Sequence, residues 1–170
     1  PRLRAGHASF GAFVLDHFEE DLNLVGREHL RRPEVQAVNQ LVRDHLDAID
    51  VREARLAHGD FDASQIFQGE GRYTGLIDFG GVRGAHPLYD LGHFRCHEDE
   101  ILGAGALKSL LGGYAEVSPL RADAMQRIVF ISLLIGLRRL ARSLRRHPDW
   151  VAYHRTRVAA IRRDLAYFGG

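Results

Sequence analysis

Three short stretches in the middle of the chain decide how its fold is interpreted. They read His58-Gly59-Asp60-Phe61-Asp62-Ala63-Ser64-Gln65, Leu76-Ile77-Asp78-Phe79-Gly80 and Pro87-Leu88-Tyr89-Asp90-Leu91-Gly92. Each stretch sets an aspartate beside glycine and apolar residues. One aspartate can accept the proton of an attacking hydroxyl, and another, at the end of a strand, can hold Mg²⁺ against nucleotide phosphates. The order and spacing of the stretches therefore indicate a phosphoryl-transfer site.

These stretches resemble the catalytic and metal-binding loops of the aminoglycoside phosphotransferase family, whose members are kinase-like enzymes. The family carries a His-Gly-Asp-x-x-x-x-Asn loop and, further on, an Ile-Asp-hydrophobic-Gly loop. The resemblance implies that Asp60 is catalytic and that Asp78 binds Mg²⁺ and, through it, the nucleotide. Gln65 takes the place of the family's metal-binding Asn and is expected to share this role. Its extra methylene moves the amide oxygen by about 1.5 Å, roughly one covalent bond.

The remaining polar residues of the stretches receive secondary roles. Asp62 stands where most family members have His. It could replace Gln65 as a metal ligand, or it could support a residue that binds the metal. The resemblance gives His58 and Asp90 supporting roles in the catalytic loop, with Asp90 bonding backbone N–H groups there or capping a helix. The alternative is three unrelated turns, because an Asp that follows Gly often only forms a turn.

Apolar periodicity predicts helices on both sides of these loops. The first is expected from Ser9 to Leu24, with Ser9 as its N-cap and Gly26 closing it, and the second from Pro33 to Ile49. Further helices are expected at about 89–95, 102–114, 120–146 and 148–168. Gly112-Gly113 should weaken the C-terminal end of the helix at 102–114.

A β-hairpin is expected between the two predicted site loops. Strands at 65–68 and 72–77 would be joined by the turn Gly69-Glu70-Gly71, which places Gln65 and Asp78 at the same rim. Residues 55–58 only lead into the catalytic loop on this interpretation. Gly80, Gly81 and Gly84 would form a flexible loop, with Phe79 packed inward.

The predicted fold class is mainly α with a small β-hairpin. By resemblance this is a protein-kinase-like C-terminal lobe over residues 1–170, with the catalytic loop at 58–65, the metal loop at 76–80 and C-terminal helices at 89–168. The family's N-terminal lobe carries a phosphate loop and a lysine on a strand, and neither precedes His58. The expectation is a fragment that lacks the N-terminal lobe and is inactive when isolated.

Composition limits the other possibilities. The chain has 170 residues, of which 45% are hydrophobic, as expected for one folded domain. A net charge of +1 gives no general preference for nucleic acid. The longest apolar stretch, Ile128 to Leu137, is about half of a membrane span. Cys96 is the only cysteine, so an intrachain disulfide is excluded and a cytoplasmic location is expected.

Two charge clusters were open to two interpretations. Arginines at 138, 139, 142, 145 and 146 form either a solvated helix face or a contact for an anionic ligand. The acidic run at 98–100 is either an exposed loop or a wall for a cationic substrate. Because the later helices are rich in arginine, an aminoglycoside substrate is doubtful.

The predicted function is transfer of a phosphoryl group from ATP or GTP, with Mg²⁺, to a hydroxyl of a small molecule. The alternative is a catalytically inactive kinase-like binding module, in which Gln65 marks lost metal affinity.

Overall fold

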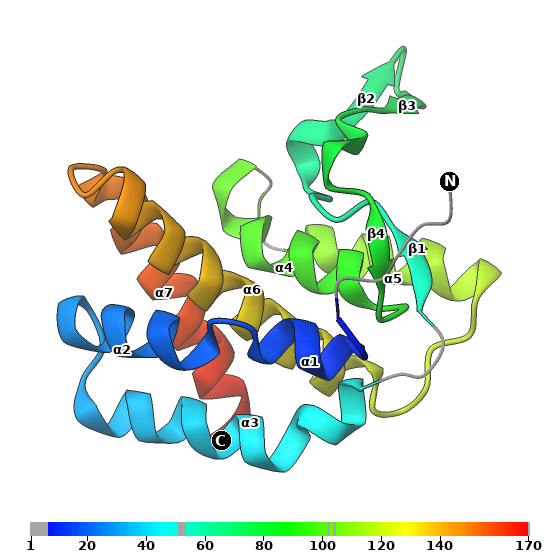
Figure 1. Ribbon diagram of the computed structural model, residues 1–170. Helices are drawn as coiled ribbons and strands as arrows, with labels where there is room; N and C mark the ends of the chain where they lie inside the picture. The colour runs from blue at the N-terminus through cyan, green and yellow to red at the C-terminus, as the bar shows by residue number, and fades with distance from the viewer. Residues whose placement is uncertain (1–6, 51–53, 102, 104, 170) are drawn as a thin grey trace, which may run out of the picture.

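The computed structural model describes residues 7–50, 54–101, 103 and 105–169. These residues form a mostly helical body from which a β-hairpin projects (Figure 1). The helices are α1 (Phe10–Leu15), α2 (Phe18–Glu28), α3 (Arg32–Ile49), α4 (Tyr89–Ile101), α5 (Ala106–Val117), α6 (Ala124–Arg146) and α7 (Val151–Phe168). The strands are β1 (Arg55–Ala57), β2 (Ile66–Gly69), β3 (Arg72–Leu76) and β4 (Arg83–Ala85), and the 3₁₀ turns are η1 (Ala63–Gln65) and η2 (Phe79–Gly81).

The hydrophobic core is built around α6. Every residue of α6 from Ile128 to Leu137 is buried, as expected for a helix that is apolar on all sides. Helices α4 and α7 pack along α6, and α2 and α3 also contact it (Figure 1). No helix in the described part of the chain combines the length and the apolar character needed to cross a membrane.

The first predicted helix is wrong in one respect, because it is two helices. Ser9 caps α1 by accepting a hydrogen bond from the backbone N–H of Ala12 at 3.1 Å. The chain then breaks at His17, which has a left-handed backbone (φ 63°), and α2 begins at Phe18. The acidic side chains in the first turn of α2 favour a new helix N-terminus there. Gly26 lies inside α2, where it lets Val35 approach closely.

The predicted β-hairpin is present, and a second strand pair was missed. Strands β2 and β3 pair antiparallel, with left-handed backbones at Glu70 (φ 52°) and Gly71 (φ 73°), as a type I′ turn requires. Strand β1 pairs antiparallel with β4, which replaces the expected flexible loop. Strands of three residues show no readable alternation, and their partners are far apart in sequence.

The later helices were predicted with errors at their ends. Helix α4 continues to Ile101, α5 passes through Gly112-Gly113 to Val117, and α6 and α7 begin after the expected positions. Part of the segment predicted as helix 102–114 lies outside the described residues, as do the side chains of 99 and 100. Phe79 was expected to pack inward, but 58% of it is exposed, because it sits on the short turn η2.

Candidate active site

Backbone contact joins the two predicted site loops. Gly59 has a left-handed backbone (φ 83°), and a Cβ built on it would lie 2.0 Å from the carbonyl oxygen of Gly81. Only glycine allows this approach. The pairing of β1 with β4 leads the two loops to this point. The chain therefore places Asp60, one residue after Gly59, next to the loop that begins at Asp78.

Asp90 and His58 fix the position of the loop formed by residues 58–65. Both carboxylate oxygens of Asp90 accept hydrogen bonds from the loop, from the backbone N–H of His58 at 2.8 Å and from that of Gly59 at 2.9 Å. The His58 ring is buried, and its Nε2 donates to the carbonyl oxygen of Ile77 at 2.8 Å. The same histidine therefore links the 58–65 loop to the residue before Asp78. Asp90 thus bonds backbone N–H groups of this loop, and the supporting roles of Asp90 and His58 in a catalytic loop stay predictions.

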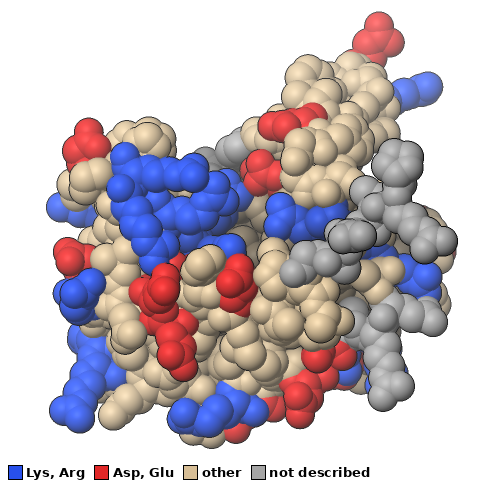
Figure 2. Space-filling view, in the orientation of Figure 1, with Lys and Arg blue, Asp and Glu red and all other residues tan. Residues whose placement is uncertain are grey.

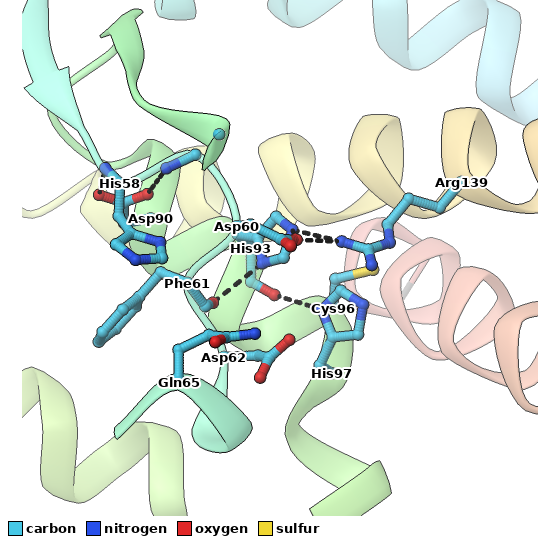
Figure 3. A network of polar contacts seen from close by, with 12 residues as sticks. His58, Asp60, Phe61, Asp62, Gln65, Asp90, His93, Cys96, His97 and Arg139 are labelled. Carbon is cyan, nitrogen blue, oxygen red and sulfur yellow. Dashed lines mark hydrogen bonds and ion pairs between the residues drawn. The ribbon is translucent and has the colours of Figure 1, made fainter. Parts of the chain in front are cut away.

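Asp60 lies between His93 on α4 and Arg139 on α6 (Figure 3). Its Oδ1 is 3.1 Å from His93 Nε2 and accepts a hydrogen bond from Arg139 Nη1 at 2.8 Å. His93 and Arg139 hold the pKa of the Asp60 carboxyl far below its usual value, although partial burial acts the other way. Asp60 is therefore ionised at any physiological pH.

His93 makes two further polar contacts besides the one with Asp60. Its Nδ1 lies 2.9 Å from the carbonyl oxygen of Phe61, which can only accept a hydrogen bond (Figure 3). Its Nε2 lies 2.6 Å from Arg139 Nη1, which can only donate. Arg139 Nη1 therefore contacts both Asp60 and His93, and His93 and Arg139 together stabilise the ionised form of Asp60.

Sequence reasoning missed both partners of Asp60. His93 follows Asp90 by three residues, so the two share one face of α4, and this spacing was the available signal. Arg139 belongs to the arginine series that could have been a solvated face. That interpretation is wrong for Arg139, and also for Arg138, which donates to the carbonyl oxygen of Asp16 at 3.0 Å.

Asp60 and Asp78 line the same cavity, which has a volume of about 480 Å³. Its walls combine apolar and basic side chains. Figure 2 shows basic side chains gathered beside a hollow in this face of the molecule. The charged residues that line it are Asp21, Asp60, Asp78, Arg83, Arg138, Arg139, Arg142 and Arg146.

Asp78 projects from a constrained position at the end of the hairpin. Its backbone is left-handed (φ 59°, ψ 59°), a region in which aspartate is enriched among non-glycine residues. The side chain is exposed, with only a 3.4 Å contact from the backbone N–H of Gly80. The backbone N–H of Ile77 donates to the carbonyl oxygen of Gln65 at 3.1 Å, which keeps the two predicted metal-binding positions adjacent.

Gln65 and Asp62 differ in how they lie. Gln65 ends η1, and its Nε2 donates to Ser64 Oγ at 3.2 Å, which leaves its amide oxygen available. Asp62 is buried and caps η1 through Ser64 N at 2.8 Å. Its carboxylate lies beside His93 and His97 (Figure 3). One carboxylate oxygen of Asp62 and one ring nitrogen from each histidine lie within 4.8 Å of one another. Asp78 therefore faces the cavity, whereas the buried carboxylate of Asp62 accepts a hydrogen bond within its own loop.

Comparison with known proteins gives one family and two solved structures. The sequence model of the phosphotransferase enzyme family matches residues 4–125. The fold is similar to a thermostable mutant of aminoglycoside phosphotransferase APH(4)-Ia, with a TM-score of 0.72 and 16% identity over 98% of this chain and 55% of that one. It is also similar to a Thermobifida fusca YX-ER1 protein assigned as a fructosamine-3-kinase, with a TM-score of 0.61 and 23% identity over 93% and 51% of the two chains. The chain thus spans about half the length of both. No curated protein sequence matches it significantly.

Proposed function

Because the chain belongs to the phosphotransferase enzyme family, we propose that it transfers the γ-phosphoryl group of ATP or GTP to a hydroxyl of a small molecule. The proposal rests on one observation, namely that Asp60 and Asp78 reach the same cavity from two loops in backbone contact. Phosphoryl transfer needs one group to orient the attacking hydroxyl and another to hold the metal-bound phosphates. The two aspartates supply these two functions.

Asp60 orients the acceptor hydroxyl in this proposal. A general base works best with a pKa near the working pH, and the pKa of Asp60 lies far below that. Asp60 therefore accepts a hydrogen bond from the hydroxyl and positions it, and takes its proton only late in the reaction. Arg139 neutralises Asp60 when no acceptor is bound, and it is placed to stabilise negative charge that develops on the acceptor oxygen.

Asp78 and Gln65 would hold Mg²⁺. Carboxylate and amide oxygens are the hard ligands that this ion prefers, and Asp78 is exposed with little competition for its oxygens. When bound, Mg²⁺ supplies charge neutralisation for the nucleotide phosphates. Asp62 was the other candidate ligand, and in this proposal it shapes the loop by capping η1, which ends at Gln65.

The nucleotide cleft requires more than these residues. The chain spans about half of the solved structures that it resembles. We therefore propose that an N-terminal lobe outside the 170 residues covers the nucleotide, and that the 170-residue chain is inactive without it. We also propose a cytoplasmic location, since the one cysteine, Cys96, is buried and unpaired.

Calorimetry of nucleotide binding tests the proposal. ATP and GTP would be titrated into the complete protein with and without Mg²⁺, followed by an assay of phosphoryl transfer to a panel of hydroxyl compounds. Binding that depends on Mg²⁺, together with transfer to a hydroxyl, is the expected result. Absence of both would support the non-catalytic binding module instead.

A further inference from the structure

The cavity next to Asp60 carries an excess of positive charge. Five arginines and three aspartates line it. Two of those aspartates are already paired, because Asp60 binds Arg139 and Asp21 binds Arg145 at 2.6 Å. Arg142 and Arg146, in contrast, have no ion-pair or hydrogen-bond partner among the described residues. Two guanidinium groups therefore stand free at the cavity.

Helix stability does not account for this pair of arginines. A cation in the last turn of a helix is favoured, and α6 ends at Arg146. Arg145 satisfies the same preference while turning to Asp21. Like charges four residues apart, as at 142 and 146, destabilise a helix. Both of these side chains nevertheless line the cavity, where a bound anion would relieve their repulsion.

Aromatic rings line the same cavity as the free arginines. Trp150 stacks face to face on His147, with ring centroids 3.9 Å apart and planes at 9°, and 49% of Trp150 remains exposed. Tyr153 also lines the cavity. Exposed aromatic faces of this kind pack against the apolar faces of a sugar or another ring. The wall thus offers charge recognition and ring packing side by side.

The spacing along α6 sets the size of what would fit. The helix rises 1.5 Å per residue, so Arg142 lies about 4.5 Å and Arg146 about 10 Å along the axis from Arg139, which touches Asp60. Resting on the phosphotransferase function proposed above, we propose that the acceptor carries a phosphate or carboxylate group bound by Arg142 and Arg146 while its hydroxyl meets Asp60. Arginine suits this role, because its planar fork binds such oxyanions in pairs of hydrogen bonds.

The tryptophan provides a direct measurement of binding. Trp150 is the only tryptophan of the chain, and it lines the cavity. Its fluorescence would be followed while ribose 5-phosphate, ribose or glucosamine is added to the 170-residue chain. The expected result is a saturable change with ribose 5-phosphate, reversed by inorganic phosphate, and none with the neutral or cationic sugar. Equal responses to all three sugars, or none to the phosphate ester, would overturn the proposal.

Substitutions assign the effect to the two arginines. The double variant Arg142→Gln/Arg146→Gln is expected to weaken ribose 5-phosphate binding about tenfold or more, since charged hydrogen bonds are lost. The matched control is Arg155→Gln, which removes an exposed arginine of α7 that does not line the cavity. Unchanged affinity in the double variant, or an equal loss in the control, would contradict the assignment. Both arginines are exposed, and an unchanged near-ultraviolet circular dichroism spectrum shows that the variant is folded.

A nucleotide phosphate is the other source of the same chemistry. If Arg142 and Arg146 served the nucleotide, the double variant would bind Mg²⁺-ATP more weakly and ribose 5-phosphate normally, and that outcome overturns the proposal. In the complete protein, anion binding that depends on Arg142 and Arg146 without any phosphoryl transfer would reject the proposed function while the anion site at the two arginines stands. Phosphoryl transfer to neutral or cationic acceptors, without anion binding, would support the proposed function and overturn the proposal of an anionic acceptor.

Discussion

Arg139 on α6 donates to the carboxylate of Asp60 at 2.8 Å, although 79 residues separate the two in sequence. The helix that forms the centre of the hydrophobic core thus also contributes the cation closest to the proposed catalytic residue. Because α6 is buried along most of its length, Arg139 is held on a rigid element. Rigid placement of charge is what phosphoryl transfer requires from a protein.

The contact between Gly59 and Gly81 is expected to be intolerant of any side chain. Gly59→Ala would place Cβ 2.0 Å from the Gly81 carbonyl oxygen and would also strain a backbone at φ 83°. We expect a loss of more than about 3 kcal/mol in the free energy of unfolding, or failure to fold. Gly71→Ala is the matched control, since its φ is 73° but nothing lies within 4 Å of its Cβ. It should cost about 1 kcal/mol. Similar urea midpoints for the two variants would disprove the close approach.

Asp90 is expected to act on stability more than on chemistry. Asp90→Ala leaves the backbone N–H groups of His58 and Gly59 without their acceptors. Such losses cost about 1–3 kcal/mol each when the groups remain unsatisfied. Chemical denaturation would measure this, with the exposed Asp47→Ala as control. A midpoint equal to that of the parent would mean that water replaces Asp90 without penalty.

Acid is expected to destabilise the fold through His97. Burial lowers the pKa of His97 to about 3 in the folded state, against about 6.5 when unfolded. The unfolded chain therefore binds this proton more readily. Above pH 6.5 the free energy of unfolding therefore does not depend on the titration of His97. It decreases as the pH falls from 6.5 toward 3, by up to about 1.4 kcal/mol per pH unit. His97→Phe should flatten the dependence of unfolding free energy on pH between 6.5 and 5. The exposed His17→Asn should not, and equal slopes in both variants would refute this role.

The metal assignment predicts an order of effects on Mg²⁺-dependent nucleotide affinity. Asp78→Ala should abolish it, because a charged ligand is lost. Gln65→Ala should weaken it less, because its ligand is neutral, and Gln65→Asn should keep or raise it, because the same oxygen sits on a shorter arm. Calorimetry on the three variants gives the order. Strong binding that is indifferent to position 65 would show that another group is the second ligand.

The sequence was informative where structure depends on local pattern. The hairpin turn at Gly69-Glu70-Gly71 and the N-cap at Ser9 were predicted because turn and cap chemistry is local. The predicted hairpin also placed Gln65 and Asp78 at one rim, and the backbone N–H of Ile77 donates to the carbonyl oxygen of Gln65 at 3.1 Å.

What escaped prediction depends on tertiary contact. Three features were missed: the pairing of β1 with β4, the approach of Arg139 to Asp60 and the break of the first helix at His17. The first two are contacts between segments that are far apart in the sequence. Hydrophobic periodicity shows which face of a helix is polar, but it does not show what lies opposite that face. The sequence pattern around an arginine is therefore the same whether the side chain faces water or a carboxylate. The position of Asp62 beside His97 was hidden for the same reason.

The most direct test of the account is the turnover number of Asp60→Asn in the complete protein, measured with Mg²⁺-nucleotide and an acceptor that the parent phosphorylates. Asparagine keeps the shape but cannot take the proton, and it loses the charge that Arg139 balances. We expect kcat to fall by about 10²–10⁴-fold while folding is preserved, as judged by the thermal midpoint. A kcat within a few-fold of the parent would remove Asp60 from the mechanism and contradict the assignment of this cavity as an active site.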